Sequence, residues 1–438
     1  MPADEPTHPE ARSAAEHVAR VLQDAGHTAY FAGGCVRDEL LGLHPKDYDV
    51  ATDATPDRVG ELFRSTAHVG ASFGVVIVRL TKADRIGLAA PVQIEVATFR
   101  TDGSYSDGRR PDSVRFATAV EDAQRRDLTI NALFLDPIAP ADGEAIHGHV
   151  IDHVGGMSDL AARIVRAVGN PADRLREDHL RALRGLRFAA RLGFDIDSAT
   201  SEAIRSEAGH LAGVSTERIG DEIKRMLAHE SRAQAVRLMR EHGLEAAAVG
   251  PPEREDLDRL ETLPADADIP TALAAWALDR GDLGVTFRER LCLSNEHTDA
   301  FASILDTAER LRYDWPGLRI AQRKRLAAKP VFARALDVLR GQDAAGAECI
   351  TDEAARLATT PNGLSPTPLL GGSDLIQAGY RPSPLFSLAL DRSYDAQLEG
   401  RATSREACLA VARTILDAGP DGPKPSSESR ESDPRGNR

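Results

Sequence analysis

The chain has 438 residues, of which 42% are hydrophobic and 28% are charged, and its formal net charge is −14 at pH 7. This length exceeds the needs of one domain, the composition is typical of globular proteins, and no apolar run is long enough to span a membrane. Because a negative surface repels nucleic acid, any nucleic-acid site must be a local basic patch.

The first part of the chain predicts alternating helices and strands after a polar lead over residues 1–10, which we expect to be disordered. Pro56 suits the first turn of a helix, and runs of β-branched residues bounded by charges and turns favour strands. Helices are predicted over residues 11–27, 36–43 and 56–63, and strands over residues 28–33, 47–53, 73–80 and 92–100. We therefore predict an α/β head over residues 11–154.

After about residue 155 the strand signals fade, and the readable pattern is helical. One helix is predicted over 176–194, ending at a Gly193 cap, and a helix pair is predicted over 214–244 from an imperfect capping box at Ser215. The expected division is a helical neck over 155–214, a body over 215–330, a tail over 331–417 and a disordered C-terminus over 418–438.

The cysteines and the N-terminus bear on location. Cys35, Cys292, Cys349 and Cys408 form no CxxC pair and have no spaced histidines beside them, which predicts neither a zinc site nor a disulfide framework. The N-terminal segment is acidic and lacks the apolar core of a secretory signal. We expect a cytoplasmic protein.

Two aspartates one residue apart are the first chemical signal. Asp47 and Asp49 in "DYD" would share one face of a strand, about 6.5 Å apart along the chain. Paired carboxylates can hold the two ions of a two-metal site, and Mg²⁺ suits oxygen ligands and triphosphates. The alternative is a solvated strand edge.

A glycine pair stands about a dozen residues earlier. Gly33 and Gly34 precede a predicted helix, whose free N–H groups and dipole favour phosphate. Arg37, one turn into that helix, is placed to reach the same phosphates. The glycine pair is weak evidence alone, but together with the two aspartates it predicts a nucleotide site.

This combination, "GGCVRD" followed by "DYD", resembles the nucleotidyltransferase fold of the DNA polymerase β type. Within that fold it resembles the family of class II tRNA nucleotidyltransferases (CCA-adding enzymes) and bacterial poly(A) polymerases. Three further segments match the family's motifs: "VQIEVATFR", "RRDLTINALF" and "REDHLRALRGLRFAARLGF". The resemblance is strong from about Tyr30 to about Leu227 and continues more weakly as far as "GSDLIQAGYRP".

The resemblance implies roles for the first two of these segments. Glu95 corresponds to a strand acid behind the metal-binding aspartates, and Arg126 would contact the triphosphate. Arg126, Asp127 and Asn131 also carry donors and acceptors suited to a ribose hydroxyl, so they can select ribonucleotides. The alternative for this segment is a salt-bridged helix start.

The third segment predicts how the base is read. On one helix, Asp178 and Arg181 share a face and can mimic a Watson–Crick edge, accepting from the amine of C or A and donating to a ring atom. Arg184 and Arg187 also match the family pattern, but helical geometry prevents all four from touching one base, so they reach phosphate or hold the helix against the head. His179 has no assigned function, and we expect it at the surface. The alternative is a solvated, salt-bridged helix.

The resemblance implies a CCA-adding enzyme that uses CTP, ATP and Mg²⁺ on the tRNA 3′ end and releases pyrophosphate. The runner-up is a poly(A) polymerase or an A-adding enzyme of the same family, and a catalytically silent RNA-binding protein is more distant. The segment over 99–116 corresponds to a mobile loop needed for A addition, which disfavours a CC-only enzyme. The intact acidic and basic motif residues disfavour the silent protein.

Two local basic stretches, over residues 318–340 and 224–240, stand out on this acidic chain. Either could hold a tRNA backbone through phosphate contacts, although ordinary solvated helix faces are an equal alternative. Neither has the interleaved aromatic residues of a single-strand platform, which favours a structured RNA. We expect tRNA or another RNA 3′ end as the partner, with no DNA and no membrane.

Overall fold

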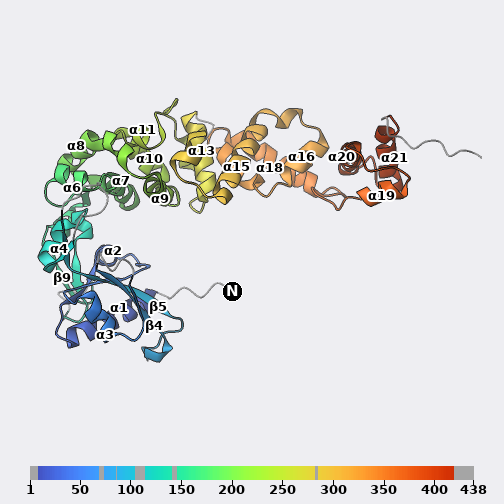
Figure 1. The fold of residues 1–438 in the computed structure, drawn as a ribbon. Helices are drawn as coiled ribbons and strands as arrows, with labels where there is room; N and C mark the ends of the chain where they lie inside the picture. The colour runs from blue at the N-terminus through green and yellow to red at the C-terminus, as the bar shows by residue number, and fades with distance from the viewer. Residues whose placement is uncertain are drawn as a thin grey trace, which may run out of the picture. The chain divides into compact units, whose positions relative to one another are not determined.

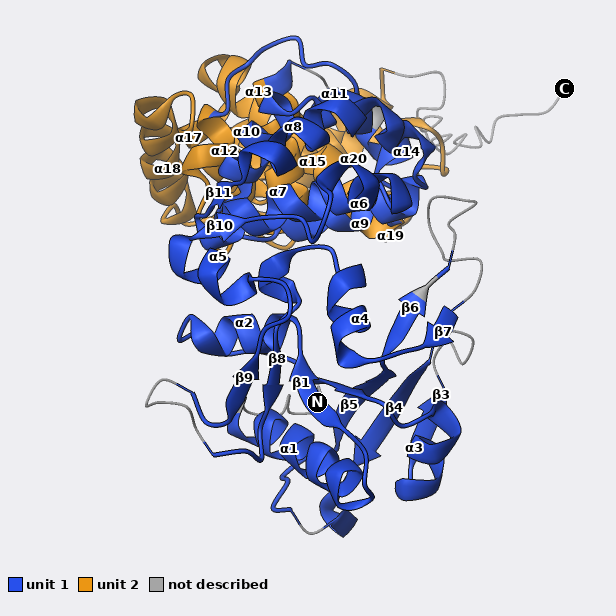
Figure 2. Cartoon of the chain, turned by 90° about the vertical axis from the view of Figure 1, so that its left-hand side faces the viewer, with its two compact units in different colours: residues 1–257, 280–294 blue, residues 258–279, 295–438 orange. Residues whose placement is uncertain are grey.

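The computed structural model describes residues 8–68, 74–84, 86–103, 114–140, 146–281 and 285–418. Its contacts form two compact units (Figure 2): unit 1 holds residues 1–257 and 280–294, and unit 2 holds residues 258–279 and 295–438. The expected disordered ends lie outside the described residues, except that residues 8–10 belong to the first helix and residue 418 is a turn. Most of the loop expected over 99–116 also lies outside them. In the described part of the chain, no helix is long and apolar enough to cross a membrane.

Unit 1 begins with a seven-stranded mixed sheet in the order β3-β4-β5-β2-β1-β8-β9 (Figure 1). Strands β2 and β5 are parallel, and the other neighbours are antiparallel. The strands are β1 (Ala29–Ala32), β2 (Asp49–Thr52), β3 (Thr66–His68), β4 (Val75–Leu80), β5 (Val92–Thr98), β8 (Phe134–Asp136) and β9 (His149–Ile151). Strands β6 (Arg100–Asp102) and β7 (Val114–Phe116) form a separate pair.

Side chains that alternate along the strands cover the two faces of this sheet differently. Phe31 and Val50 point into the large core that α1 (His8–Asp24) helps to fill. Their neighbours Ala32 and Ala51 belong to a smaller cluster on the other face. The small side chains of Ala32 and Ala51 leave room beside the sheet for the charged groups described below.

Two connections bring polar groups to this second face. The chain leaves β1 through Gly33 directly into α2 (Gly34–Leu40). Helix α4 (Ala119–Arg125) starts from a full capping box at Thr118, and the short helix η3 (Thr129–Asn131) follows it before β8. Helix α3 (Pro56–Leu62) begins at Pro56, as predicted.

The rest of unit 1 is mainly helical, which confirms the predicted fold class of an α/β head followed by helices. The helices are α5 (Gly156–Ala162), α6 (Pro171–Glu177), α7 (Leu180–Leu192), α8 (Ser198–Glu207), η4 (Ala208–Gly213), α9 (Thr216–Leu227), α10 (Arg232–Glu241), α11 (Leu244–Val249) and α14 (Val285–Arg290). Two short strands, β10 (Ile164–Val165) and β11 (Asp195–Ile196), pair in parallel within this part, where the sequence predicted no strand.

Two local predictions were wrong. The strand expected over 47–53 begins at Asp49, so Asp47 lies before it. The helix expected over 176–194 is broken at Asp178, whose φ of −156° and ψ of 104° are extended, and α7 begins only at Leu180. The predicted cap at Gly193 is confirmed. Ser215 does precede α9, but its side chain makes no capping hydrogen bond within the described chain.

Unit 2 consists of helices. They are α12 (Asp258–Thr262), α13 (Ile269–Arg280), α15 (Asn295–Tyr313), α16 (Ile320–Ala327), α17 (Phe332–Arg340), α18 (Ala344–Ala358), α19 (Gly372–Gln377), α20 (Leu385–Leu398) and α21 (Arg405–Leu416). One cluster in its C-terminal part gathers Leu375, Tyr380 and Cys408. A buried ion pair joins Arg259 to Asp279, with 3.0 Å between Nη1 and Oδ1. The further division of the helical part into neck, body and tail stays a prediction.

Candidate active site

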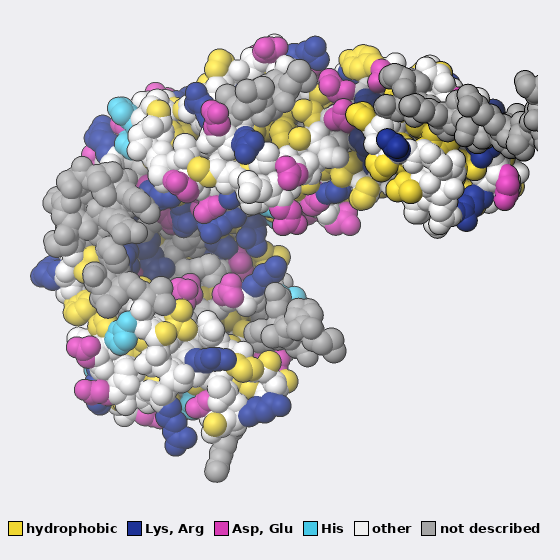
Figure 3. Space-filling view, turned by 45° about the vertical axis from the view of Figure 1, so that its right-hand side comes forward, with side chains coloured by type: hydrophobic (Ala, Val, Ile, Leu, Met, Phe, Trp, Pro, Cys, Tyr) yellow, Lys and Arg dark blue, Asp and Glu magenta, His cyan; other side chains and the backbone are white. Residues whose placement is uncertain are grey.

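A cavity of about 600 Å³ lies in unit 1 between the sheet and the helices that follow it. Eight arginines and four carboxylates line it, so the cavity is basic although the chain is acidic. Figure 3 shows Lys and Arg side chains gathered in this hollow. The lining includes twelve residues that the sequence singled out: Gly33, Gly34, Arg37, Asp49, Glu95, Arg126, Asp127, Asn131, Asp178, Arg181, Arg184 and Arg187.

The acidic wall of the cavity is formed by Asp49 and Glu95. They are register partners on the parallel strands β2 and β5, so both carboxylates leave the sheet at one place. Burial, followed by the charge of Glu95, raises the pKa of Asp49 to about 6, while Arg126 opposes the rise. Two carboxylates that repel each other beside open space form a site suited to a cation.

Asp47 is the one predicted site residue that does not line this cavity. It is exposed just before β2 and borders a smaller cavity of about 250 Å³ next to Lys46 and Tyr48. Its charge nevertheless contributes to the raised pKa of Asp49, so the two carboxylates influence each other through space. The chain is irregular up to Tyr48, so Asp47 does not lie on the strand, and strand alternation does not direct its side chain to the same place as Asp49.

The glycine turn lies against the basic side of the cavity. Gly33 has a φ of 79°, which favours glycine, and a Cβ there would stand 3.0 Å from Nη1 of Arg126. Helix α2 starts at the next residue, and its Arg37 is buried at the cavity wall. The Arg37 guanidinium donates to the Asp38 carboxylate and to the side-chain oxygen of Asn131.

Arg126 and Asp127 follow α4 and turn towards the same space. Arg126 donates twice to Asp122, at 3.1 and 3.0 Å, and once to the carbonyl oxygen of Asn131 at 3.2 Å. Asp127 accepts from Nε of Arg184 at 2.8 Å and from the backbone N–H of Leu128 at 2.8 Å. Burial alone would raise the pKa of Asp127, but the Arg184 charge and these hydrogen bonds lower it to about 2.

Asp178 and Arg181 both reach the cavity, but each is held by another partner. Arg218 of α9 forks onto Asp178, with nitrogen–oxygen distances of 2.6 and 3.2 Å. Arg181 pairs with Glu177 and donates to the carbonyl oxygen of Arg174 at 3.0 Å. Because the backbone of Asp178 is extended, Asp178 and Arg181 do not lie on the one continuous helix that the sequence predicts. Their shared position comes from the junction of α6 and α7.

The remaining arginines of α7 link it to its surroundings. Arg184 joins α7 to the head through Asp127, with 2.7 Å between Nη2 and Oδ2. Arg187 instead pairs with Glu222 of α9, with 2.7 Å between Nε and Oε2. Sequence reasoning missed Phe188, whose ring centroid lies 4.7 Å from Arg37 and 4.3 Å from Arg187. The signal available in the sequence was one aromatic residue in an arginine-rich helix, because an aromatic ring attracts guanidinium groups to its face.

Sequence reasoning also missed Arg218 as a site residue, together with Arg125 and Arg191 in the lining. Arg218 stands three residues after Ser215, where a capping box would have Glu or Gln. Its forked contact with Asp178 spans 40 residues along the chain. Spacing along a single helix does not reveal such a contact.

The first basic stretch, over 318–340, is largely neutralised within unit 2. Arg323 pairs with Glu353, Arg325 with Asp395, and Lys329 with Asp306. Lys324 is buried and donates to Thr360, while Arg334 and Arg340 also pair with aspartates. These contacts favour a structural role for the stretch.

The second stretch, over 224–240, borders a different space. Arg225 and His229 line a cavity of about 230 Å³ together with Arg187 and Arg191 of α7. Arg191 also lines the large cavity, so basic side chains continue from one space to the other. This continuity favours the second stretch over the first as a contact for a polyanion.

Comparison with known proteins places this site in a family. The family model described as "Poly A polymerase head domain" matches residues 29–166, and that described as "Probable RNA and SrmB- binding site of polymerase A" matches residues 193–249. A CCA-adding enzyme of Limosilactobacillus fermentum is 33% identical over 412 residues, which are 91% of this chain and 95% of that protein. The chain belongs to the family of CCA-adding enzymes and poly(A) polymerases. This family consists of nucleotidyltransferases, which generally use a divalent metal.

Other members show how far the likeness extends. A CCA-adding enzyme of Bacillus pumilus is 42% identical over 223 residues, so the matched part spans about half of each chain. The crystal structure of a Bacillus stearothermophilus CCA-adding enzyme in complex with CTP is 28% identical, with a TM-score of 0.75 over 92% of this chain and 98% of that one. A Thermotoga maritima CCA-adding enzyme complexed with tRNA is 18% identical with a TM-score of 0.65 over 93% and 96% of the two chains, which shows the shared fold.

Proposed function

We propose that this protein is a CCA-adding enzyme: a template-independent nucleotidyltransferase that adds C, C and A to the 3′ end of tRNA from CTP and ATP. The observation that carries the proposal is the large cavity, which combines the acid pair Asp49–Glu95 with the base-reading residues Asp178 and Arg181. The relative that matches over 91% of the chain bears this name, and the similar structure at 28% identity is a complex with CTP.

Asp49 and Glu95 are the residues that would hold Mg²⁺, and Asp47, which borders a different cavity, would have to move towards them to join the site. The donor set fits, because Mg²⁺ prefers carboxylate oxygens and a cation would offset the burial and the Glu95 charge that raise the pKa of Asp49. When bound, Mg²⁺ would neutralise triphosphate charge and make the RNA 3′-OH a better nucleophile.

The residues of the chain would bind and orient the substrates. The N–H groups at the start of α2 and the guanidinium of Arg126 face the cavity, where they suit the triphosphate. Asn131, which lines the same space, offers an amide for the ribose hydroxyl. Attack of the 3′-OH on the α-phosphate forms one phosphodiester bond and releases pyrophosphate, and fixed orientation of both reactants lowers the barrier.

Base selection would rest on Asp178 and Arg181. A carboxylate accepts from the exocyclic amine of C or A, and a guanidinium donates to a ring nitrogen or carbonyl. G and U carry a carbonyl oxygen in place of that amine, so the Asp178 carboxylate would face another acceptor instead of a donor. Because Arg218 already holds Asp178, the carboxylate must face the base while it keeps or exchanges this partner.

The second candidate is a poly(A) polymerase, since the matched family models carry that description. One assay separates the two. The protein is incubated with Mg²⁺ and tRNA that lacks its 3′ CCA, with CTP alone, ATP alone, or both. Two C residues followed by one A are expected, whereas long A tracts from ATP alone would establish the polymerase. A single A on tRNA ending in CC, with no C added to shorter tRNA, would establish an A-adding enzyme.

The same assay tests whether the protein is a silent RNA-binding relative. Asp49→Asn should lower incorporation by about a hundredfold or more, because Asp49 would hold the Mg²⁺ whose positive charge stabilises the transferring phosphates. The control is Asp57→Asn, which changes an exposed aspartate in the first turn of α3. Equal incorporation by wild type and Asp49→Asn would contradict the catalytic role.

A further inference from the structure

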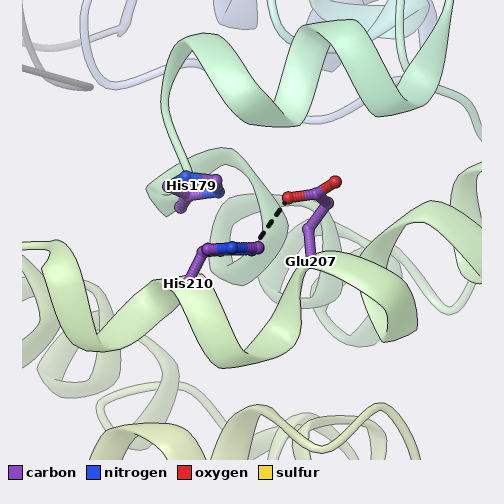
Figure 4. Close-up of side chains that lie close together, drawn as sticks. All are labelled: His179, Glu207 and His210. Atoms are coloured by element: carbon purple, nitrogen blue, oxygen red, sulfur yellow. Dashed lines mark ion pairs between the residues drawn. The ribbon is translucent and has the colours of Figure 1, made fainter.

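Two histidines and a glutamate meet away from the large cavity. His179 lies between α6 and α7, Glu207 ends α8, and His210 belongs to η4 (Figure 4). One ligand atom from each lies within 4.8 Å of the others. Among the described residues, this is the one group of three His, Cys, Asp or Glu side chains found close enough to hold an ion. The sequence predicted no zinc site, because 31 residues separate His179 from His210 and the fold alone unites them.

The contacts within the group leave donor atoms available. Nδ1 of His210 lies 3.0 Å from Oε2 of Glu207, and the other oxygen of Glu207 lies 3.2 Å from Nε of Arg176. The rings of His179 and His210 are stacked, with centroids 5.2 Å apart and an angle of 19° between their planes. Figure 4 shows the Glu207 carboxylate at the edge of this stack.

His179 carries the most informative atom. Its Nδ1 is buried and has no hydrogen-bond partner among the described residues. A buried polar atom without a partner is unfavourable and calls for an explanation such as a ligand. Burial, followed by the neighbouring His210, lowers the pKa of His179. A lowered pKa favours the neutral ring, which is the form that offers a lone pair to a metal. The residue as a whole is half-buried, between the expected surface position and the core.

We propose that His179, Glu207 and His210 form a binding site for one transition-metal ion of the zinc class. Two imidazole nitrogens and one carboxylate oxygen are a common donor set for Zn²⁺, with water in the remaining position. Mg²⁺ prefers oxygen ligands throughout, so this site is chemically distinct from the acid pair of the large cavity.

The site needs only side-chain adjustment to close on an ion. The in-plane lone pairs of two stacked rings lie in nearly parallel planes and do not meet at one point. At least one ring must therefore turn before both can bind the same ion. His210 can turn, because its side chain is 68% exposed. Glu207 is 10% exposed and is oriented by Arg176, which is the kind of outer contact that fixes a ligating carboxylate.

The position of the site gives it a structural consequence. His179 adjoins Asp178 at the junction of α6 and α7, and the other two ligands come from α8 and η4. An ion would therefore tie this junction to η4. The inference stands on the three side chains and does not depend on the proposed function.

The test is a Co²⁺ titration of the full metal-free chain, without a histidine tag and in excess Mg²⁺. Co²⁺ at a site with imidazole ligands gives visible d–d absorption, and Zn²⁺ should displace it. His210→Ala, Glu207→Gln and His179→Ala should each weaken binding at this site by about 10–100-fold or more. His27→Ala is the matched control, because His27 pairs with Asp53 at 3.2 Å but belongs to no such group in the described chain.

The outcomes of the titration distinguish a metal site from a simple ion pair. Loss of one bound ion in all three ligand variants, with the control unchanged, supports the site. No Co²⁺ absorption, or equal absorption in the wild type and the ligand variants, would show that the group is a histidine–glutamate ion pair. Circular dichroism of each variant checks the fold, and the exposed His210 makes His210→Ala the variant least prone to unfold.

Discussion

Arg218 illustrates how single residues in the cavity hold one another before any substrate arrives. Its fork onto Asp178 uses both oxygens of the carboxylate that we propose reads the base. A forked contact restricts both the position and the rotation of a carboxylate. Arg218 therefore acts as a positioning residue for nucleotide choice, although it lies on a different helix from Asp178.

Arg218→Gln should relax nucleotide choice more than it lowers the rate with CTP. An Asp178 side chain without its fork samples other orientations, and one forked contact is worth about 1–3 kcal/mol of discrimination. We expect the ratio of kcat/KM for CTP over UTP to fall by about tenfold. The control is Lys224→Gln, which removes a half-buried partner of Asp221 on the same helix. An unchanged ratio would leave Arg218 with a purely structural role.

At the scale of elements, the ion pair between Asp127 and Arg184 contributes to the contact between α7 and the head. Asp127 follows α4, and its side chain is 10% exposed beside Arg184 of α7. The pKa of this carboxyl falls from 3.8 to about 2 in the fold. A carboxyl with a lowered folded pKa stabilises the fold above its unfolded pKa and loses that contribution as pH falls towards the folded value.

Arg184→Met should therefore destabilise the chain at neutral pH by about 2 kcal/mol or more. The difference in the free energy of unfolding between wild type and variant should be constant above about pH 4. It should shrink between pH 4 and 2, because the pKa of Asp127 is 3.8 in the unfolded chain and about 2 in the fold. Urea unfolding followed by circular dichroism measures the effect. Arg58→Met, which breaks an exposed pair with Glu61, should cost no more than about 0.5 kcal/mol. A difference that persists unchanged to pH 2 would rule out Asp127 as its source.

Some features of the helices and strands could be predicted from the sequence, and others could not. Helix starts and stops at Pro56 and Gly193 were predictable, because each residue restricts the backbone locally. The break at Asp178 was not predictable from local signals, since the flanking residues favour helix and the contact that holds Asp178 comes from α9. The register of Asp49 with Glu95 depends on pairing between strands 46 residues apart. The family resemblance, rather than periodicity, brought Glu95 into the site.

For the whole molecule, charge is distributed unevenly between surface and interior. The chain carries −14, yet the large cavity has twice as many arginines as carboxylates. Arg323 and Arg325 of the 318–340 stretch pair with acids of unit 2, whereas Arg225, which pairs with Glu222, borders a second space that Arg191 shares with the large cavity. The net charge and the basic stretches in the sequence could not show which cations line a cavity, because the fold decides where each arginine lies and which acid it pairs with.

This difference predicts where tRNA binds. The double variant Arg191→Gln, Arg225→Gln should weaken tRNA binding and lower the slope of log Kd against log salt by about one for each lost phosphate contact. The matched double variant Arg323→Gln, Arg325→Gln should leave the slope unchanged, because both cations pair with acids of unit 2 and line neither of the two basic cavities. Filter binding across a salt series measures both. Equal slopes in all three proteins would place the RNA elsewhere.

The internal pairing of the cavity has one more consequence, for turnover. Asp178 pairs with Arg218, Asp127 with Arg184, and Arg37 with Asp38, so these charged groups of the cavity already have partners within the chain. A nucleotide that binds through them must exchange those contacts, and the same partners can form them again when the product leaves. Each exchange reduces the net free energy gained on binding. An enzyme that must release pyrophosphate and accept a different base at its last step would gain from such reversible exchange, because no round would end with a tightly trapped ligand.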